Sequence, residues 1–289
     1  MRIGIVTPVL IQHPATRGPW EAAAGIDEVA AIAESADRLG YHHLTCSEHV
    51  AVPTAVASER GGTYFDPLST LGFLAARTHR IRLATQVLVL GYHHPLEIAK
   101  RYGTLDRISG GRVVLGLGVG SLREEFDLLG ATFAGRGDRA DDALRALRAS
   151  LGRPNPTYRG EFYDFDDVVV QPHAAQERVP LWIGGRSARS LRRAIELGDG
   201  WVPFGLGLGD LTEMLARTTV PDGMAVVLGT SRPLDPAAAP DTAVRALTRL
   251  RDAGATIAGV TLAATSATHY CDQLSTLKHL AQAVDIEFD

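Results

Sequence analysis

Three short stretches of this sequence place glycine or acid–base side chains directly after short apolar runs. They are Gly118-Val119-Gly120, Gly184-Gly185-Arg186 and Glu48-His49. Glycine carries no Cβ, so its backbone N–H groups stay accessible to a ligand. A glycine pair at the start of a helix, with an arginine beside it, attracts anions, and a histidine can exchange a proton near neutral pH. The three stretches predict a site that holds a planar or phosphate-bearing molecule and moves protons.

The elements that must position these stretches are parallel strands, each followed by a helix. Strand patterns occur at residues 2–7, 43–46, 81–90, 113–117, 181–183, 200–203, 224–228 and 256–262, and helix patterns at 27–39, 67–78, 95–108, 138–151, 187–197, 241–253 and 269–283. A small hairpin is expected within 158–170, and three glycines weaken the helix pattern of 204–223. Eight βα units favour an α/β fold of the (β/α)8 TIM-barrel type, with ligands at the carboxyl ends of the strands. An open, doubly wound sheet is the alternative.

Length and composition restrict the class of protein. The chain has 289 residues, of which 45% are hydrophobic and 21% are charged, and no linker divides it. We therefore expect a single domain over residues 1–289. The net charge of −4 and the lack of a basic stripe argue against a nucleic-acid or anionic membrane partner. Two cysteines, without metal-ligand spacing, fit a reduced cytoplasmic setting.

Targeting and membrane signals are weak. The apolar run 3–11 is interrupted by Pro8 and is typical of a first strand rather than of a signal peptide. No apolar run approaches the ~18 residues that a membrane helix needs.

Two common nucleotide-binding motifs do not fit the glycine clusters. Gly116-Leu-Gly118-Val-Gly120 lacks the spacing of the dinucleotide fingerprint, and the turn after the first strand pattern has no glycine run. No Gly-Lys-Ser/Thr triplet exists, which excludes a P-loop. Gly184-Gly185-Arg186 is either a phosphate site at a helix start or a tight βα turn.

Several stretches, taken together and in order, carry a family resemblance. They lie at residues 40–49, 64–71, 74–83, 94–100, 105–112, 123–126, 182–186 and 198–201. In these stretches the chain resembles the luciferase-like flavin and deazaflavin oxidoreductases, and the short branch that uses coenzyme F420 is the most similar. The resemblance implies a luciferase-like TIM barrel with loop insertions at the C-terminal face, a homodimer, and a cofactor across that face. Residues 204–289 show only the general βα pattern.

The resemblance also implies roles for individual cofactor-binding positions. A non-proline cis peptide bond beneath the cofactor ring is expected at Gln86-Val87, within an otherwise plain buried strand pattern. The backbone of Val119 and Gly120 is expected to contact the ring or its side chain. In the sugar-phosphate-oxidising branch of the family, the next position holds a catalytic carboxylate. This chain has Ser121 there, which argues against a sugar phosphate as its substrate.

The predicted catalytic residues are His49 and Glu48, and the resemblance places His49 near the reacting ring atoms. The remaining side chains are assigned from their positions: His13 and His93 fall just after strands and are expected to line the pocket. Gly184, Gly185 and Arg186 are the predicted phosphate ligands. Glu124 and Glu125 are expected on a solvated helix face, and Asp106 and Arg112 are expected to tie a helix to a strand. The loops 10–26 and 50–64, with Trp20 and Tyr64, are expected to cover a small-molecule substrate.

The leading hypothesis is an oxidoreductase that transfers hydride between coenzyme F420 and an unidentified small organic substrate. An FMN-dependent luciferase-like monooxygenase is the alternative within the family, and a non-catalytic flavin-binding protein is the alternative of another class. A metal-dependent hydrolase could use His13, Glu48, His49 and His93. The first strand has no H-x-H pair and the chain has no dedicated ligand spacing, so no metal site is predicted.

Overall fold

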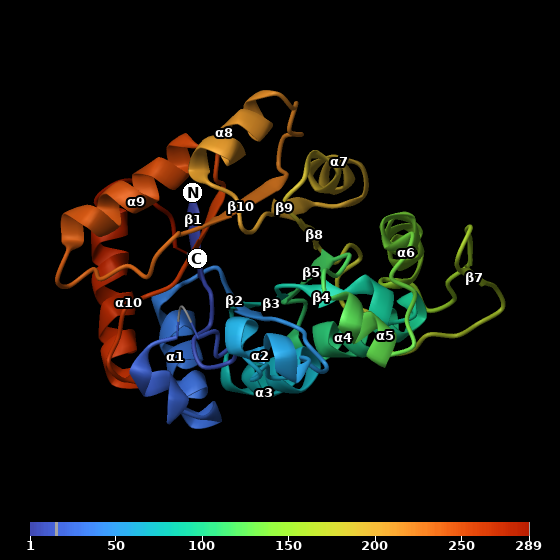
Figure 1. The fold of residues 1–289 in the computed structure, drawn as a ribbon, viewed down its shortest axis with the longest axis horizontal. Coiled ribbons are helices and arrows are strands. Elements are labelled where there is room, and N and C mark those ends of the chain that lie inside the picture. The colour runs from blue at the N-terminus through green and yellow to red at the C-terminus, as the bar shows by residue number, and fades with distance from the viewer. Residues whose placement is uncertain (15–16, 289) are drawn as a thin grey trace.

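The computed structural model describes residues 1–14 and 17–288 and shows a closed ring of parallel strands (Figure 1). The strands of the ring are β1 (Arg2–Ile5), β2 (His43–Cys46), β3 (Arg82–Thr85) with β4 (Leu88–Val89), β5 (Val113–Gly118), β8 (Leu181–Gly184), β9 (Gly200–Val202), β10 (Ala225–Gly229) and β11 (Ile257–Val260). Pairing runs β3-β2-β1-β11-β10-β9-β8-β5, and β3 pairs with β5 to close the ring. The predicted (β/α)8 barrel is confirmed, and the doubly wound alternative is wrong.

Helices surround the ring and follow the strands in the expected alternation (Figure 1). They are α1 (Ile26–Leu39), α2 (Thr54–Arg60), α3 (Pro67–Arg77), α4 (Pro95–Ser109), α5 (Arg123–Leu128), α6 (Arg136–Ser150), α7 (Ala188–Leu197), α8 (Leu208–Ala216), α9 (Pro240–Asp252) and α10 (Ala267–Gln282), with the short 3-10 turns η1 (Pro19–Ala22) and η2 (Leu90–Tyr92). The predicted hairpin is present as β6 (Tyr158–Arg159) and β7 (Asp164–Phe165). None of the described helices is long and apolar enough to cross a bilayer.

Local sequence signals account for several helix ends. Gly40 ends α1 in the left-handed conformation with φ of 81°, which glycine adopts without strain. Asp66 caps α3, because its side chain accepts a hydrogen bond from the Ser69 N–H, and Pro67 occupies the first helical position. These ends agree with the expected ones to within about one residue.

The prediction of one continuous strand over 81–90 is wrong. The structure divides it into β3 and β4, which are separated by Gln86 and Val87. The peptide bond between these two residues is cis, as the family resemblance implied. An apolar run indicates burial but carries no signal for a break, so the hydrophobic pattern alone could not locate it.

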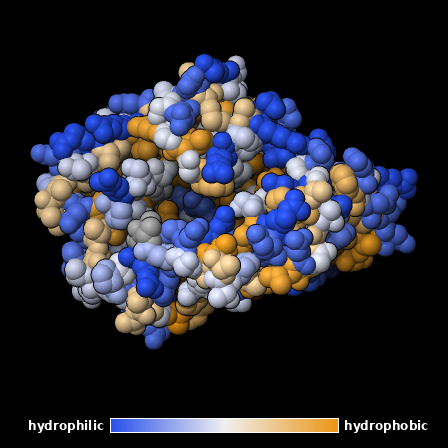
Figure 2. Space-filling model, in the orientation of Figure 1, coloured by the Kyte–Doolittle hydropathy of each residue, from blue (hydrophilic) through white to orange (hydrophobic). Residues whose placement is uncertain are grey.

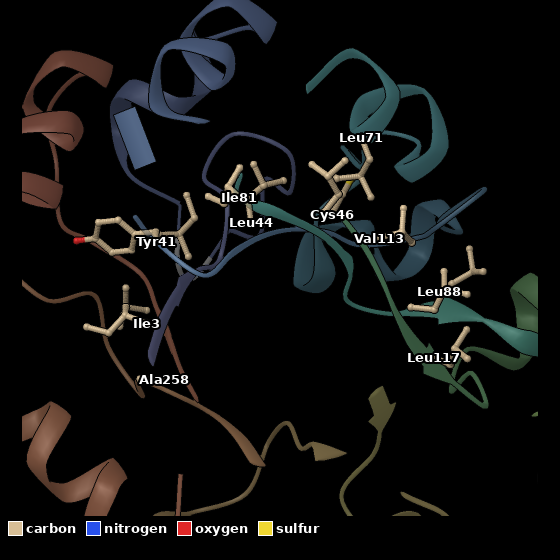
Figure 3. Packing of buried hydrophobic residues seen from close by; sticks show 14 of the residues in the cluster. Ile3, Tyr41, Leu44, Cys46, Leu71, Ile81, Leu88, Val113, Leu117 and Ala258 are labelled. Atoms are coloured by element: carbon tan, nitrogen blue, oxygen red, sulfur yellow. The ribbon is translucent and has the colours of Figure 1, made fainter. Parts of the chain in front are cut away.

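The core has two parts because successive strand residues face opposite sides of the barrel wall. Val113, Leu115 and Leu117 of β5 belong to the large cluster between strands and helices, part of which Figure 3 shows. Val114 belongs to a separate small cluster with Trp182 and other residues of neighbouring strands. The second cluster fills the barrel interior, as side-chain layers do in this fold.

Asp106 and Arg112 join α4 to the barrel, as expected. The Asp106 carboxylate accepts hydrogen bonds from the Val113 N–H at 3.1 Å and from the backbone N–H of Gln176 at 2.9 Å. The buried Arg112 guanidinium donates to the Ala75 carbonyl at 2.8 Å and to the Ile81 carbonyl at 3.1 Å. These bonds fix the start of β5, and so they fix the glycines at its carboxyl end.

Candidate active site

The cis peptide at the end of β3 is held by the segment that follows β2. The Gln86 N–H donates to the Cys46 carbonyl at 2.8 Å. The Ser47 hydroxyl donates to the Gln86 carbonyl, and the Glu48 N–H donates to the Val87 carbonyl at 3.3 Å. Both carbonyls of the bulge are therefore satisfied, and the two side chains of the bulge remain half-buried at the carboxyl end of the strands.

Glycines in the carboxyl-terminal halves of β5 and β8 make room for this bulge. A Cβ on Gly118 would lie 2.6 Å from Val87 Cγ2, and a Cβ on Gly184 would lie 2.8 Å from Val87 Cγ1. A Cβ on Gly116 would lie 2.0 Å from the Thr85 carbonyl oxygen. The sequence interpretation, in which these glycines bare their backbone to a ligand, is therefore incomplete. The space that side chains at positions 118 and 184 would fill is occupied by the isopropyl group of Val87.

This packing leads to a prediction about stability. Gly118→Ala should lower the free energy of unfolding by about 1–3 kcal/mol, because the new methyl group overlaps Val87. The cost should fall by half or more in a Val87→Ala background, where the overlap is absent. Urea unfolding of the four proteins of this cycle measures the coupling. Gly72→Ala is the matched control, because nothing lies within 4 Å of its Cβ position. An equal cost in both backgrounds would contradict the packing argument.

Glu48 and His93 form a buried pair directly beside the bulge. Glu48 Oε1 lies 2.6 Å from His93 Nε2, and Glu48 Oε2 accepts the Val89 N–H at 2.7 Å. Burial alone would lower the pKa of His93, but the hydrogen bond and charge of Glu48, together with the charge of Glu97, outweigh it and raise that pKa. Both oxygens of the Glu48 carboxylate are thus engaged within the protein, one of them by the last residue of β4.

His49 and Glu125 form a second pair. His49 Nδ1 lies 2.7 Å from Glu125 Oε2, and Tyr92 donates its hydroxyl to the same oxygen at 2.8 Å. Glu125 Oε1 accepts the N–H groups of Val50 at 2.6 Å and Ala51 at 3.1 Å. The carboxylate has no exposed surface. The expectation of a solvated face is therefore wrong for Glu125, whereas Glu124, on the same helix α5, is exposed.

The hydrogen bonds of Glu125 favour its ionised form. Burial would raise the pKa of this carboxyl, but the bonds from His49, Ala51 and Tyr92 outweigh it and lower the pKa. An ionised Glu125 accepts a hydrogen bond from the Nδ1–H of His49. Nε2 is then the ring nitrogen that is open to a ligand, and no described residue hydrogen-bonds it. The His49 side chain is 20% exposed and its ring packs against Tyr64, with centroids 4.5 Å apart.

The other predicted residues lie around the same end of the barrel. Gly120 has a φ of 76°, a Cβ there would meet the Phe126 ring, and its carbonyl accepts a hydrogen bond from Arg136. Val119 is half-buried and Ser121 is exposed. Neither of these two residues hydrogen-bonds His49 or Glu125.

The predicted phosphate ligands come just before α7. Gly185 has a φ of 143°, and Ser187 caps the helix by accepting the Ser190 N–H. The exposed Arg186 extends towards Gly205, because an Arg186 guanidinium nitrogen lies 4.0 Å from the Cβ position of that glycine. The strand–glycine–helix pattern of the sequence is confirmed here.

The largest cavity described has a volume of about 940 Å³ and opens beside Gln86. Its walls come from the segment after β9, from α8, from the segment after β10 and from α9. The lining residues are Gln86, 203–208, Leu211, 229–235, Ala239, Thr242, Ala243, Arg245, Ala246, Arg249 and Leu250. The volume is within the range of small-molecule sites, and Figure 2 shows a hollow near the middle of the face that it draws. Of the predicted cofactor ligands, only Gln86 lines this cavity.

Sequence reasoning missed Glu125, Tyr92 and the cavity walls. Glu125 could have been found from its position, since it follows the glycines of β5 on a short helix beside the buried Phe126. Much of the wall lies in residues 203–208 and 229–235, where glycine and proline dilute the periodic pattern. Within the described residues, no group of three or more histidine, cysteine or carboxylate side chains is arranged to hold a metal ion. His49 and His93 of the hydrolase alternative instead pair with two different glutamates.

Comparison with known proteins gives consistent results. A family model described as luciferase-like monooxygenase matches residues 1–269. An uncharacterized protein of Mycobacterium tuberculosis is 30% identical over 198 residues, which cover 64% of this chain and 68% of that protein. The crystal structure of the monooxygenase RslO1 from Streptomyces bottropensis has a TM-score of 0.76 at 22% identity, with 98% and 99% of the two chains covered. An F420-dependent secondary alcohol dehydrogenase in complex with an F420-acetone adduct has a TM-score of 0.74 at 14% identity, with 98% of each chain covered.

Proposed function

The chain belongs to the luciferase-like monooxygenase family, and from this premise we propose that it is an oxidoreductase that transfers hydride between coenzyme F420 and a small organic substrate. The observation that carries the proposal is the cis peptide Gln86-Val87, because Gln86 also lines a cavity of about 940 Å³ and the segment that holds the peptide leads directly into His49. The F420-dependent dehydrogenase of the same fold supports the choice of coenzyme. The RslO1 monooxygenase supports oxygenation as the second candidate, for which FMN is the cofactor that we propose.

The residues present fit a flavin-like tricycle with an anionic tail. Gly229 and Gly259 have no atom nearer than 3.8 Å to their Cβ positions, so the barrel end is open at β10 and β11. Gln86 and Val87 would lie under the ring, with Val119, Gly120 and Ser121 at its edge. Gly184, Gly185 and Arg186 would hold the phosphate at the start of α7. When bound, the deazaflavin supplies a ring carbon that donates or accepts a hydride.

The chain's own residues supply proton transfer and positioning. We assign to His49 Nε2 the proton that the substrate gains or loses, because Nδ1 is committed to Glu125. Glu125 fixes the orientation and tautomer of this imidazole. We assign to Glu48 a positioning role, because its two oxygens hold Val89 and His93 and so hold the bulge. The predicted single-domain organisation over residues 1–289, the homodimer and the cytoplasmic location remain part of the proposal.

Coenzyme binding tests the proposal directly. Titration of the purified chain with F420, followed by the coenzyme's fluorescence, should give a dissociation constant about tenfold or more below that for FMN. Gly185→Ala is a useful variant, because its φ of 143° and the 2.6 Å approach to Ser190 Cβ disfavour a side chain there, and it should weaken both. Tighter binding of FMN than of F420 would support the monooxygenase instead. Binding of neither would overturn both assignments.

A further inference from the structure

The cavity beside Gln86 has a charged wall that the proposed coenzyme ring does not use. Four of its lining residues carry charge, namely Arg232, Arg245, Arg249 and Asp235. The excess on this wall is positive, whereas the chain as a whole has a net charge of −4. A concave surface with one sign of charge concentrates ligands of the opposite sign.

These three arginines have no acidic partner in the described part of the chain. Arg245 donates to the Thr242 hydroxyl at 3.0 Å, and no carboxylate lies within ion-pair distance of any of the three. Several other arginines do have such partners: Arg77 pairs with Glu34, Arg101 with Glu97 and Arg217 with Glu213. The cavity wall therefore carries three guanidinium groups that no carboxylate of the described residues pairs with.

Asp235 offsets only one of the three positive charges. Its carboxylate accepts the Ala238 N–H at 3.0 Å and the Gln273 side-chain amide at 2.7 Å. The hydrogen bond from Ala238, followed by that from Gln273, lowers the pKa of this carboxyl. Asp235 is thus tied to the turn before α9, and its role is to shape that turn.

The rest of the cavity wall is mainly apolar. Leu211, Leu234, Ala243 and Leu250 are buried along it, and Phe204 is 54% exposed in the segment after β9. Figure 1 shows that α8 and α9, which carry much of this wall, follow β9 and β10 at the edge of the ring. A ligand that fills the cavity is in contact with an apolar surface and with three cations at the same time.

We propose that this cavity binds an amphipathic organic anion, whose apolar body lies against the leucines and whose carboxylate, sulfonate or phosphate groups pair with Arg232, Arg245 and Arg249. Guanidinium groups suit such partners because they form paired, charge-assisted hydrogen bonds with planar or tetrahedral oxyanions. The inference rests on the proposed function in one respect: Gln86 belongs both to the cavity wall and to the proposed ring floor, so the bound anion lies next to the reacting centre. The anionic group belongs either to the substrate or to the tail of the coenzyme.

Two fluorescent probes that share one apolar ring system test whether binding to the cavity requires an anionic group. 8-Anilinonaphthalene-1-sulfonate carries a sulfonate, and N-phenyl-1-naphthylamine lacks it. We expect the chain to bind the sulfonate in one-to-one stoichiometry about tenfold more tightly than the neutral probe. The triple variant R232Q/R245Q/R249Q should lose about tenfold in affinity for the sulfonate and change little for the neutral probe.

The matched control removes the same charge elsewhere. R145Q/R153Q/R192Q replaces three exposed arginines that have no ion pair among the described residues and lie outside the cavity. It should bind both probes as the unmodified chain does. Equal losses in the two triple variants, or no preference for the sulfonate in the unmodified chain, would overturn the proposal. Circular dichroism of each variant shows whether it is folded.

A second titration identifies the source of the anion. If the cavity holds the coenzyme tail, R232Q/R245Q/R249Q should weaken F420 about tenfold, and saturating F420 should displace the sulfonate probe. If it holds the substrate, F420 binding should be unchanged in this variant and the probe should still bind to the loaded protein. Both results support the anion site. Because the probe measurements use the chain without coenzyme, failure to bind F420 counts against the proposed function and leaves this test intact.

Discussion

Replacement of His49 by alanine should lower kcat by about 10² or more, with a change in the dissociation constant of F420 of less than about threefold. The reason is that His49 Nε2 is the proton-exchanging atom in the proposed mechanism, and a missing general acid or base leaves the proton to water. The measurement is the absorbance change of F420 with a donor or acceptor found by screening small alcohols and carbonyl compounds. Added imidazole should restore part of the lost rate, because the variant leaves a space of that shape.

Glu125 gives the companion result. Glu125→Gln keeps the size of the side chain but removes the negative charge that orients His49, so kcat should fall about tenfold or more. Tyr92→Phe removes one of four hydrogen bonds to the same carboxylate and should have a smaller effect. His79→Ala, at an exposed histidine, is the control and should leave kcat unchanged. If the His49→Ala enzyme kept more than a third of the original kcat, His49 would not be the residue that exchanges the proton.

The sequence predicted well those helices and strands whose ends are marked by local sequence signals. Strand β2 was predicted with its observed bounds because a short run of residues lies between Gly40, where a helix end was expected, and a polar segment. Helix α3 was predicted from an aspartate cap followed by proline. In both places the backbone conformation, the side-chain preference and the hydrophobic pattern favour the same structure, as is expected of a consistent sequence.

The candidate site was predicted only in part, because its geometry depends on contacts between distant residues. His49 was expected to act, but its partner Glu125 lies 76 residues later in the chain, on a helix of six residues. The residues Arg123 to Phe126 do not by themselves distinguish a solvated glutamate from a buried one, and only the position of Glu125 after the glycines of β5 points to the site. The Val87 side chain between Gly118 and Gly184 likewise joins three strands, so the glycine pattern suggested a ligand where the structure has an isopropyl group.

The cavity was missed for a different reason. Its walls are segments whose irregular backbone follows β9 and β10, and such segments carry little periodic signal. A closed ring of eight strands brings their ends together whatever their sequence, so only the completed topology reveals that residues 203–208 and 229–235 share one space with Gln86. The binding and catalytic residues of this fold lie at such strand ends, where the hydrophobic periodicity that predicts strands and helices is weakest.

Acid pH is expected to lower the stability of the fold strongly, and this second large effect originates in the barrel interior. His42 and His43 are buried at the start of β2, with their Nδ1 atoms 3.0 Å apart. The His43 ring lies against Gly4 and Trp182, and its Nε2 has no hydrogen-bond partner. Burial lowers the pKa of His43 to about 3, and the positive charges of Arg2 and Arg82 act in the same direction. Burial and the neighbouring His43 lower the pKa of His42 to about 2.

Both rings are therefore neutral in the folded chain, whereas in the unfolded chain they take up protons below a pH of about 6.5. The unfolded state binds more protons, so their contribution to stability is complete above that pH and is lost as the pH falls towards 3. At pH 5 the loss is about 2 kcal/mol for each histidine, or about 4 kcal/mol for the pair. His93 has the opposite sign, because its raised pKa favours the folded state at low pH, and it offsets part of this loss.

Urea unfolding at pH 7 and at pH 5 measures the effect. His43→Asn places an amide where Nδ1 of the imidazole was and removes one titrating group, so the loss of stability between the two pH values should be smaller by about 2 kcal/mol. His79→Asn, at the surface, should leave that difference as it is in the unmodified chain. An unchanged pH difference in His43→Asn would show that the buried ring takes up its proton without unfolding, and that the barrel interior admits charge at the start of β2.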